Sequence, residues 1–169
     1  SKKQLAESNF KKFRIHNNSL FRWTKGFSLK RKKNLLVPAQ LVSFNYAPMK
    51  NEPIILPPIS TGTATGLTLD DAVYRGTCEI VERDSFMISY LNKLPSPQVN
   101  LNSIKDTRIK GILNKLRRYK LEIIVLDITT DLQIPAFAAL TLDRTGLGPA
   151  GSIGLKAGFD IKESIIGAV

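Results

Sequence analysis

Two glutamates and one arginine are the residues of this chain whose spacing is best suited to chemistry. Glu79, Glu82 and Arg83 stand at i, i+3 and i+4, and on a helix these side chains project from one face. Carboxylate oxygens are hard ligands that suit Mg²⁺, which commonly bridges protein carboxylates and phosphate groups. The cluster is therefore a candidate site for a metal-bridged phosphate. Taken alone, Glu79 and Arg83 also fit an ordinary ion pair on a wet helix face.

A capped helix is expected to carry this cluster. The glycine-rich segment 60–66 leads to Thr68, a candidate N-cap, and Asp71 follows three residues later as in a capping box. We predict a central helix over 68–91. One stripe of this helix is small and apolar at its N-terminal end and continues into the charged cluster, so we expect it to face protein or ligand. The stripe consists of Ala72, Gly76, Glu79, Glu82, Arg83 and Phe86.

The segment in front of this helix is not a P-loop. It lacks the Lys-Ser/Thr ending of that motif, and Asp70 and Asp71 occupy the first helical turn. A phosphate docked directly on that helix N-terminus would meet two carboxylates. A nucleotide would therefore have to be held further along the helix, by Glu79 and Glu82 acting through a divalent metal.

Length and composition indicate a globular domain rather than a disordered or membrane protein. The chain has 169 residues, of which 43% are apolar, and its longest apolar runs, 121–128 and 134–142, are too short to span a membrane. No signal peptide opens the sequence, so a cytoplasmic protein is expected. Cys78 is the only cysteine, and we interpret it as a small buried hydrophobe rather than a nucleophile.

The net charge of +11 is concentrated in two segments. Eleven of the 25 basic residues lie between Lys2 and Lys33, and seven more lie between Lys105 and Lys120. In the second segment the apolar residues keep helical spacing and the cations take the opposite side, which is typical of a solvated helix face. Because no nucleic-acid-binding motif accompanies the charge, nucleic acid is not the predicted partner. An acidic peptide would suit the same surface.

The order of elements predicts an α/β fold, with α+β as the alternative. A basic, weakly ordered lead-in (1–19) precedes a first half-domain (20–145), in which a short strand at 54–56 links the opening hairpin to the central helix. The helices are expected on one side of the sheet. The other elements predicted for the half-domain are a hairpin over 20–44, a helix over 104–119, and strands over 121–129 and 134–142.

An internal repeat suggests two related halves. Residues 60–66 recur as 152–158, and in the same register Asp160 and Glu163 repeat the N-cap and the capping-box acid. Each copy is expected to form a glycine-rich turn followed by a capped helix, so that 146–169 begins a second half-domain. The counterpart of Glu79 would fall beyond Val169. We therefore expect the chain to be the N-terminal part of a longer protein, or one piece of a split protein, that is inactive alone.

The same residues resemble the YcaO superfamily, and within it the SagD-like maturases that form thiazoles and oxazoles in peptides. The resemblance covers about residue 20 to the end, and its most specific part is the Glu-x-x-Glu-Arg-Asp core at 79–84. Its other matching segments are 23–26 (WTKG), 37–42 (VPAQLV), 59–72 (ISTGTATGLTLDDA), 74–84 (YRGTCEIVERD) and 86–95 (FMISYLNKLP).

The resemblance implies that ATP and Mg²⁺ bind between two related half-domains. It implies that Glu79 and Glu82 are ligands of Mg²⁺ and of the nucleotide, and that Arg83 supports them or a phosphate. The family often has Ser where Arg75 stands in this sequence, so the role of Arg75 stays open. The remaining half of the domain, a precursor peptide and a leader-binding partner protein are the implied partners, and a homodimer is a further alternative.

The implied reaction is ATP-dependent activation of a backbone amide in a ribosomally made precursor peptide. A Cys, Ser or Thr side chain of the substrate attacks the preceding carbonyl, the oxyanion is phosphorylated, and phosphate leaves to give an azoline, as in bacteriocin maturation. The resemblance thus implies that catalysis consists of positioning and charge neutralisation, and that no residue of this chain acts as a nucleophile. Two alternatives stay open: backbone thioamidation within the same superfamily, and a non-catalytic peptide-binding scaffold.

Overall fold

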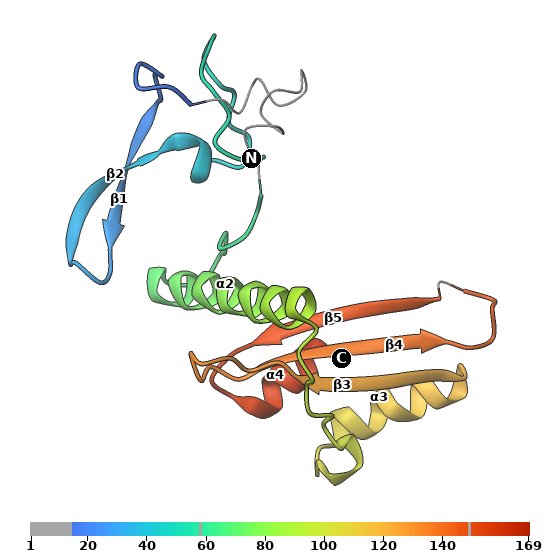
Figure 1. The fold of residues 1–169 in the computed structure, drawn as a ribbon. Coiled ribbons are helices and arrows are strands. Elements are labelled where there is room, and N and C mark those ends of the chain that lie inside the picture. The colour runs from blue at the N-terminus through green and yellow to red at the C-terminus, as the bar shows by residue number, and fades with distance from the viewer. Residues whose placement is uncertain (1–14, 58, 149) are drawn as a thin grey trace. The chain divides into compact units, whose positions relative to one another are not determined.

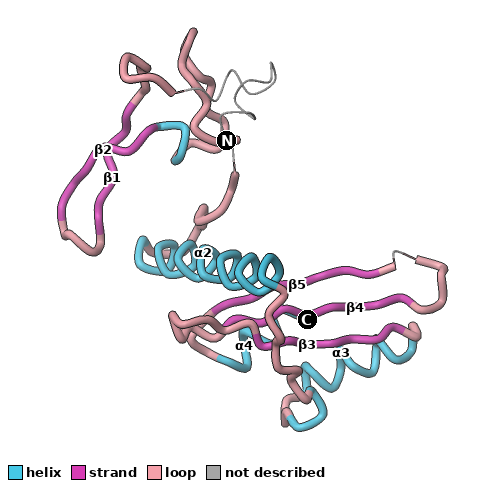
Figure 2. The backbone as a smooth tube through the Cα atoms, viewed as in Figure 1, coloured by secondary structure: helices cyan, strands magenta, loops and turns pink. Residues whose placement is uncertain are grey.

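The computed structural model describes residues 15–57, 59–148 and 150–169. The chain divides into two compact units, Ser1–Ser60 and Thr61–Val169. Figure 1 shows the elements of both units, and Figure 2 distinguishes their strands and helices from the loops. Most of the predicted lead-in, 1–19, lies outside the described residues. None of the described helices is long and apolar enough to cross a membrane.

The first unit contains one β-hairpin. Strand β1 (Trp23–Ser28) pairs antiparallel with β2 (Lys33–Pro38), which confirms the predicted hairpin but makes its second strand shorter than expected. Pro38 has no N–H to continue the ladder, and a short 3₁₀ turn over Ala39–Leu41 follows it. The predicted strand over 54–56 was wrong, because these residues lie in an irregular loop.

A buried carboxylate organises the loop of the first unit. Glu52 is 7% exposed, and its two oxygens accept hydrogen bonds from the Gln40 amide, the Tyr46 hydroxyl and the Met49 backbone N–H, at 3.0, 2.7 and 2.8 Å. Burial opposes ionisation of Glu52, but these hydrogen bonds outweigh it and hold its pKa at about 2. Glu52 therefore stabilises the hairpin-loop unit as a carboxylate, a role for which the sequence offers no spacing signal.

The second unit is a three-stranded antiparallel sheet with a helical layer on each face. Its strands lie in the order β3-β4-β5, so each connects to the next by a hairpin. The elements in chain order are α2 (Leu69–Asn92), a 3₁₀ turn (Leu101–Ser103), α3 (Thr107–Arg118), β3 (Leu121–Asp127), β4 (Ala136–Asp143), β5 (Gly151–Ala157) and α4 (Ile161–Ala168). This mixed fold confirms the predicted class.

The prediction that all helices lie on one side of the sheet was wrong. Helix α2 covers one face, whereas α3 and α4 cover the other (Figure 1). The cause is visible in β4, because Ala136 and Ala138 pack with Val81 of α2 while Phe137 and Ala139 pack in the opposite core. A strand that is apolar on both faces must be covered on both faces, and the continuous apolar run of β4 has this pattern.

The two copies of the repeat agree in their caps and differ in the segment before them. The Thr68 hydroxyl accepts a hydrogen bond from the Asp71 N–H at 3.1 Å, and the Asp160 carboxylate accepts one from the Glu163 N–H at 3.0 Å. Both capped helices are thus confirmed. The segment before the second cap is not a turn, however, because Gly151–Ala157 pairs with β4 as strand β5. By pairing with the open edge of β4, residues 151–157 satisfy their backbone N–H and C=O groups.

Candidate functional site

The N-terminal turn of α2 is fixed by a network of hydrogen bonds made by side chains. Besides the Thr68 cap, the Asp71 carboxylate accepts a hydrogen bond from the Leu67 N–H at 3.3 Å and pairs with the Arg75 guanidinium at 2.8 Å. The hydrogen bond from Arg75 lowers the pKa of Asp71. Arg75, which stands where the family resemblance leads one to expect Ser, therefore neutralises one of the two carboxylates in this turn.

Glu79 is held by both a backbone amide and a guanidinium. Its Oε2 accepts a hydrogen bond from the Gly62 N–H at 2.9 Å, and its Oε1 lies 2.8 Å from the Arg83 guanidinium. The side chain of Glu79 is 25% exposed and that of Arg83 is 50% exposed. The i to i+4 ion pair expected as an alternative is thus present. The additional bond to Gly62 fixes the carboxylate against the preceding loop, which an isolated ion pair on a wet face would not do.

The loop 61–66 lies directly on the helix at Gly76. A Cβ atom at Gly76 would stand 2.7 Å from the carbonyl oxygen of Gly62, so only glycine permits this close approach. Gly62 itself has φ of +82°, a backbone conformation that other residues rarely adopt. The two glycines together bring the Gly62 amide within reach of Glu79. The stripe predicted to face protein or ligand therefore contacts protein at Gly76, whereas Arg83 in the same stripe is half-exposed.

Glu82 points from the same helix toward the end of β5. Its Oε2 accepts a hydrogen bond from the Ala157 N–H at 3.2 Å, and Ala157 is buried. Burial raises the pKa of Glu82, against the opposing influence of the Ala157 amide and the Lys156 ammonium. The two glutamates therefore accept hydrogen bonds from backbone amides of two different segments. Gly62, which binds Glu79, precedes α2 in the sequence, and Ala157, which binds Glu82, follows it.

The donor set fits Mg²⁺ shared with a phosphate ligand better than a metal site made of protein alone. No group of three or more His, Cys, Asp or Glu residues that could hold a metal occurs among the described residues. Mg²⁺ is usually bound by one or two carboxylates together with substrate phosphates and water. Two adjacent carboxylates supply that number, and each has lone pairs left beyond its amide hydrogen bond.

A cavity beside the cluster was not predicted from the sequence. It has a volume of about 440 Å³ and lies between α2, the end of β5 and α4; Tyr74, Cys78, Lys156 and Ser164 are among its lining residues. Tyr74 stacks on Phe159 with ring centroids 6.1 Å apart. Cys78 is buried and unpaired, as expected of a small hydrophobe. No sequence pattern pairs Tyr74 with Lys156, because the two residues line one cavity only when the end of β5 lies against α2.

Comparison with known proteins identifies the family. The whole chain, residues 1–169, matches the family model described as YcaO cyclodehydratase, ATP- and Mg²⁺-binding. An uncharacterised protein encoded in the tfuA 3′ region of Rhizobium leguminosarum bv. trifolii is 30% identical over 123 residues, which are 71% of this chain and 29% of that protein.

Two solved structures share both fold and sequence with this chain. A heterocyclase in complex with substrate and cofactor has a TM-score of 0.84 and 31% identity, over 92% of this chain and 21% of that one. The heterocyclase TruD has a TM-score of 0.76 and 30% identity, over 86% of this chain and 21% of its own. The chain therefore spans less than a third of the Rhizobium relative and about a fifth of each solved chain.

Proposed function

Since the chain belongs to the YcaO family, we propose that it contributes the Glu79–Glu82–Arg83 cluster to an ATP site that activates a backbone amide of a precursor peptide for azoline formation. The observation that carries this proposal is the pairing of each glutamate with a separate backbone amide. Gly62 anchors Glu79, and Ala157 anchors Glu82. Carboxylates fixed in this way keep their positions without a metal and would need little reorganisation when Mg²⁺ and nucleotide bind.

Each residue of the cluster has a distinct proposed task. Glu79 and Glu82 would hold Mg²⁺, and bound Mg²⁺ would offset the charge of the ATP phosphates and orient them. Arg83 holds Glu79 in place through their ion pair, and its half-exposed guanidinium has further donors for a phosphate oxygen. No side chain of the chain needs to attack the substrate, because the nucleophile is a Cys, Ser or Thr of the peptide. The protein's contribution is positioning and charge neutralisation.

The partners of this activity are part of the same proposal. The substrate is a precursor peptide, presented by a leader-binding protein that is either fused or separate, and the other acidic half of the nucleotide site comes from the related half-domain. The family model and the two heterocyclase structures support the azoline chemistry over a scaffold role.

Isothermal titration of the full-length protein with Mg²⁺ and a non-hydrolysable ATP analogue tests the proposal. We expect Glu79→Gln and Glu82→Gln each to weaken binding about tenfold or more, because both keep a hydrogen-bond acceptor and lose the negative charge. Glu122→Gln is the matched control, since Glu122 is an exposed carboxylate on β3 paired with Arg144. Unchanged affinity in both cluster variants would refute the proposed site. Mass analysis of a modified precursor peptide then separates azoline formation, which loses water, from thioamidation, which exchanges oxygen for sulfur.

A further inference from the structure

The first half of β3 has an open backbone edge. β3 pairs with β4 on its inner side, and on its outer side the Val99 N–H donates to the Val125 carbonyl at 2.8 Å. Backbone groups alternate sides along a strand with a period of two, so Leu121 and Ile123 also direct their N–H and C=O groups outward. No other described residue forms a ladder with them, because the segment that pairs with Val125 turns away at Asn100.

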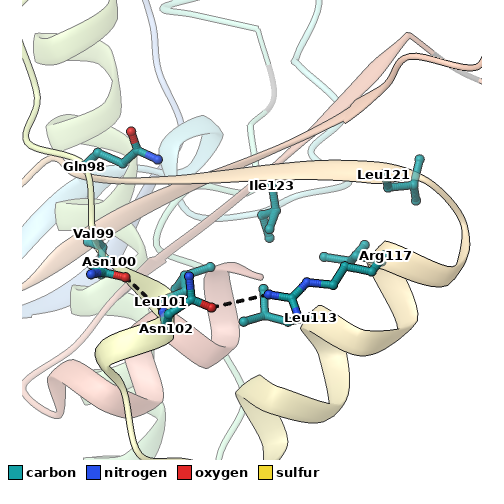
Figure 3. Close-up of a pocket in the computed structure, with 10 residues that line it drawn as sticks. Gln98, Val99, Asn100, Leu101, Asn102, Leu113, Arg117, Leu121 and Ile123 are labelled. Carbon is teal, nitrogen blue, oxygen red and sulfur yellow. Dashed lines mark hydrogen bonds between the residues drawn. The ribbon is translucent and has the colours of Figure 1, made fainter.

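A hollow of about 420 Å³ lies beside this open edge (Figure 3). Apolar side chains from β3, α3 and the 3₁₀ turn line part of it, and polar groups make up the larger share of its exposed surface. We call this hollow together with the open edge the β3–α3 groove; it is lined by Gln98, Val99, Asn100, Leu101, Asn102, Leu113, Leu116, Arg117, Leu121 and Ile123. An extended segment paired with Ile123 would direct alternate side chains into this hollow.

Helix α3, which forms one wall of the groove, is strongly basic. Lys110, Lys115, Arg117 and Arg118 of α3 form no salt bridge with any described residue, whereas Arg108 on the same helix pairs with two carboxylates. The side chain of Arg117 crosses the groove toward Asn102 (Figure 3), where the guanidinium makes one long hydrogen bond of 3.4 Å to the amide oxygen. A carboxylate would be a stronger acceptor for Arg117 than this neutral amide.

We propose that the β3–α3 groove binds an extended acidic segment of another polypeptide, which adds a strand to β3 at Leu121–Ile123. In this arrangement an apolar side chain of the segment fills the hollow between Leu113 and Ile123, and a neighbouring carboxylate pairs with Arg117. Main-chain pairing supplies affinity, and the hollow and the arginine select a segment that alternates acidic and apolar residues.

The charge of α3 and the residues that line the groove argue against two other occupants, a second copy of this chain and a nucleic acid. A second copy of this chain carries the same net charge of +11 and would be repelled from the basic helix α3. A single-stranded nucleic acid would be attracted to the charge, but no aromatic ring in the described part of the chain lines the groove as a platform for base stacking. The groove does not include Glu79 or Glu82, so the inference is independent of the proposed ATP site.

Fluorescence anisotropy with a labelled peptide of alternating Glu and Val tests this inference on the full-length protein. We expect saturable binding that weakens with added salt. Arg117→Glu is expected to reduce affinity about tenfold or more, whereas Arg118→Glu, on the same helix but outside the groove, is the control for net charge and should change it about threefold or less. A peptide of alternating Lys and Val should not bind.

Hydrogen exchange supplies the second measurement, because it reports on the backbone. Binding of the acidic peptide is expected to slow exchange of the Leu121 and Ile123 amides, which a purely electrostatic association along α3 would not do. Absence of binding, equal losses in the two arginine variants, or protection elsewhere without protection of these amides would each overturn the inference. Tighter binding of a labelled oligouridylate than of the acidic peptide, also lost in Arg117→Glu, would assign the surface to RNA instead.

Discussion

The carboxylate of Glu82 accepts a hydrogen bond of 3.2 Å from the backbone N–H of Ala157, a residue 75 positions later in the chain. The bond joins the middle of α2 to the end of β5. Because Ala157 is buried, its N–H has no ready access to water, and the carboxylate is the acceptor that satisfies it. Glu82 therefore has a structural task in addition to the proposed binding of Mg²⁺.

Two substitutions of Glu82 separate these tasks. Glu82→Gln keeps an acceptor for the Ala157 N–H, and we expect the free energy of unfolding to stay within about 0.5 kcal/mol of wild type while Mg²⁺-ATP affinity falls. Glu82→Ala leaves the buried N–H without a protein acceptor, and we expect it to cost about 1–3 kcal/mol. Urea unfolding of both variants checks this. Equal stabilities of the Gln and Ala variants would show that the bond to Ala157 contributes nothing.

The contact between Gly62 and Gly76 gives a second prediction. Gly76→Ala would place a Cβ 2.7 Å from the Gly62 carbonyl oxygen, and we expect the clash to displace the loop from α2 and to cost about 1–3 kcal/mol. Gly111→Ala in α3 is the matched control. A Cβ there meets nothing within 4 Å, so the gain in helix propensity is expected to stabilise the protein by up to about 1 kcal/mol.

Calorimetry of both glycine variants, followed by nucleotide titration, tests the link between this contact and the site. Gly76→Ala should also weaken Mg²⁺-ATP binding, because moving Gly62 removes the amide that holds Glu79. A Gly76→Ala protein as stable as wild type would mean that the loop does not lie against the helix in solution.

Cys78 gives a prediction about the chemistry. It is buried on the face of α2 toward the cavity that Tyr74 and Lys156 also line. Because no nucleophile of the chain is required, Cys78→Ala is expected to leave the rate of peptide modification unchanged while the lost packing costs about 1 kcal/mol of stability. The matched measurements are product formation and urea unfolding. Loss of activity in a folded Cys78→Ala protein would contradict the proposed mechanism.

Local sequence signals predicted the parts of the site that depend on one helix. The cap at Thr68, the extent of α2 and the shared face of Glu79 and Arg83 follow from spacing within one element, and the structure confirms them. The amide partners of the glutamates could not be predicted, because Ala157 reaches Glu82 only after β5 has paired with β4.

Two predictions about the sheet were wrong, the side on which the helices lie and the conformation of residues 152–158. Both errors arise because a short apolar run does not specify its own partners in the fold. The continuous run in β4 indicates burial on both faces, but it does not say which helix covers which face. The segment 152–158 matched a glycine-rich turn in sequence, yet Ile153 and Leu155 alternate with Ser152, Gly154 and Lys156, which also suits a strand. The open edge of β4 decided between these two conformations, and that edge exists only in the folded unit.

Glu52 gives a prediction of pH dependence for the first unit. Its pKa in the folded protein is about 2, below its ordinary value of 4.5, so the carboxylate form is favoured by folding. The stabilisation is fully present above pH 4.5 and is lost as the pH falls from 4.5 toward 2. Glu52→Gln replaces the charged acceptor with a neutral one and should lower the melting temperature at neutral pH. The difference from wild type should shrink as the pH falls through this window.

Thermal unfolding of wild type and Glu52→Gln, followed by circular dichroism at several pH values, measures this difference. Glu122→Gln serves again as the control, because Glu122 is exposed and lies in the second unit. Its melting temperature should track that of wild type at every pH. A difference between wild type and Glu52→Gln that stays constant down to pH 2 would show that ionisation of Glu52 does not stabilise the fold. In that case the hydrogen bonds from Gln40 and Tyr46 would contribute through geometry alone.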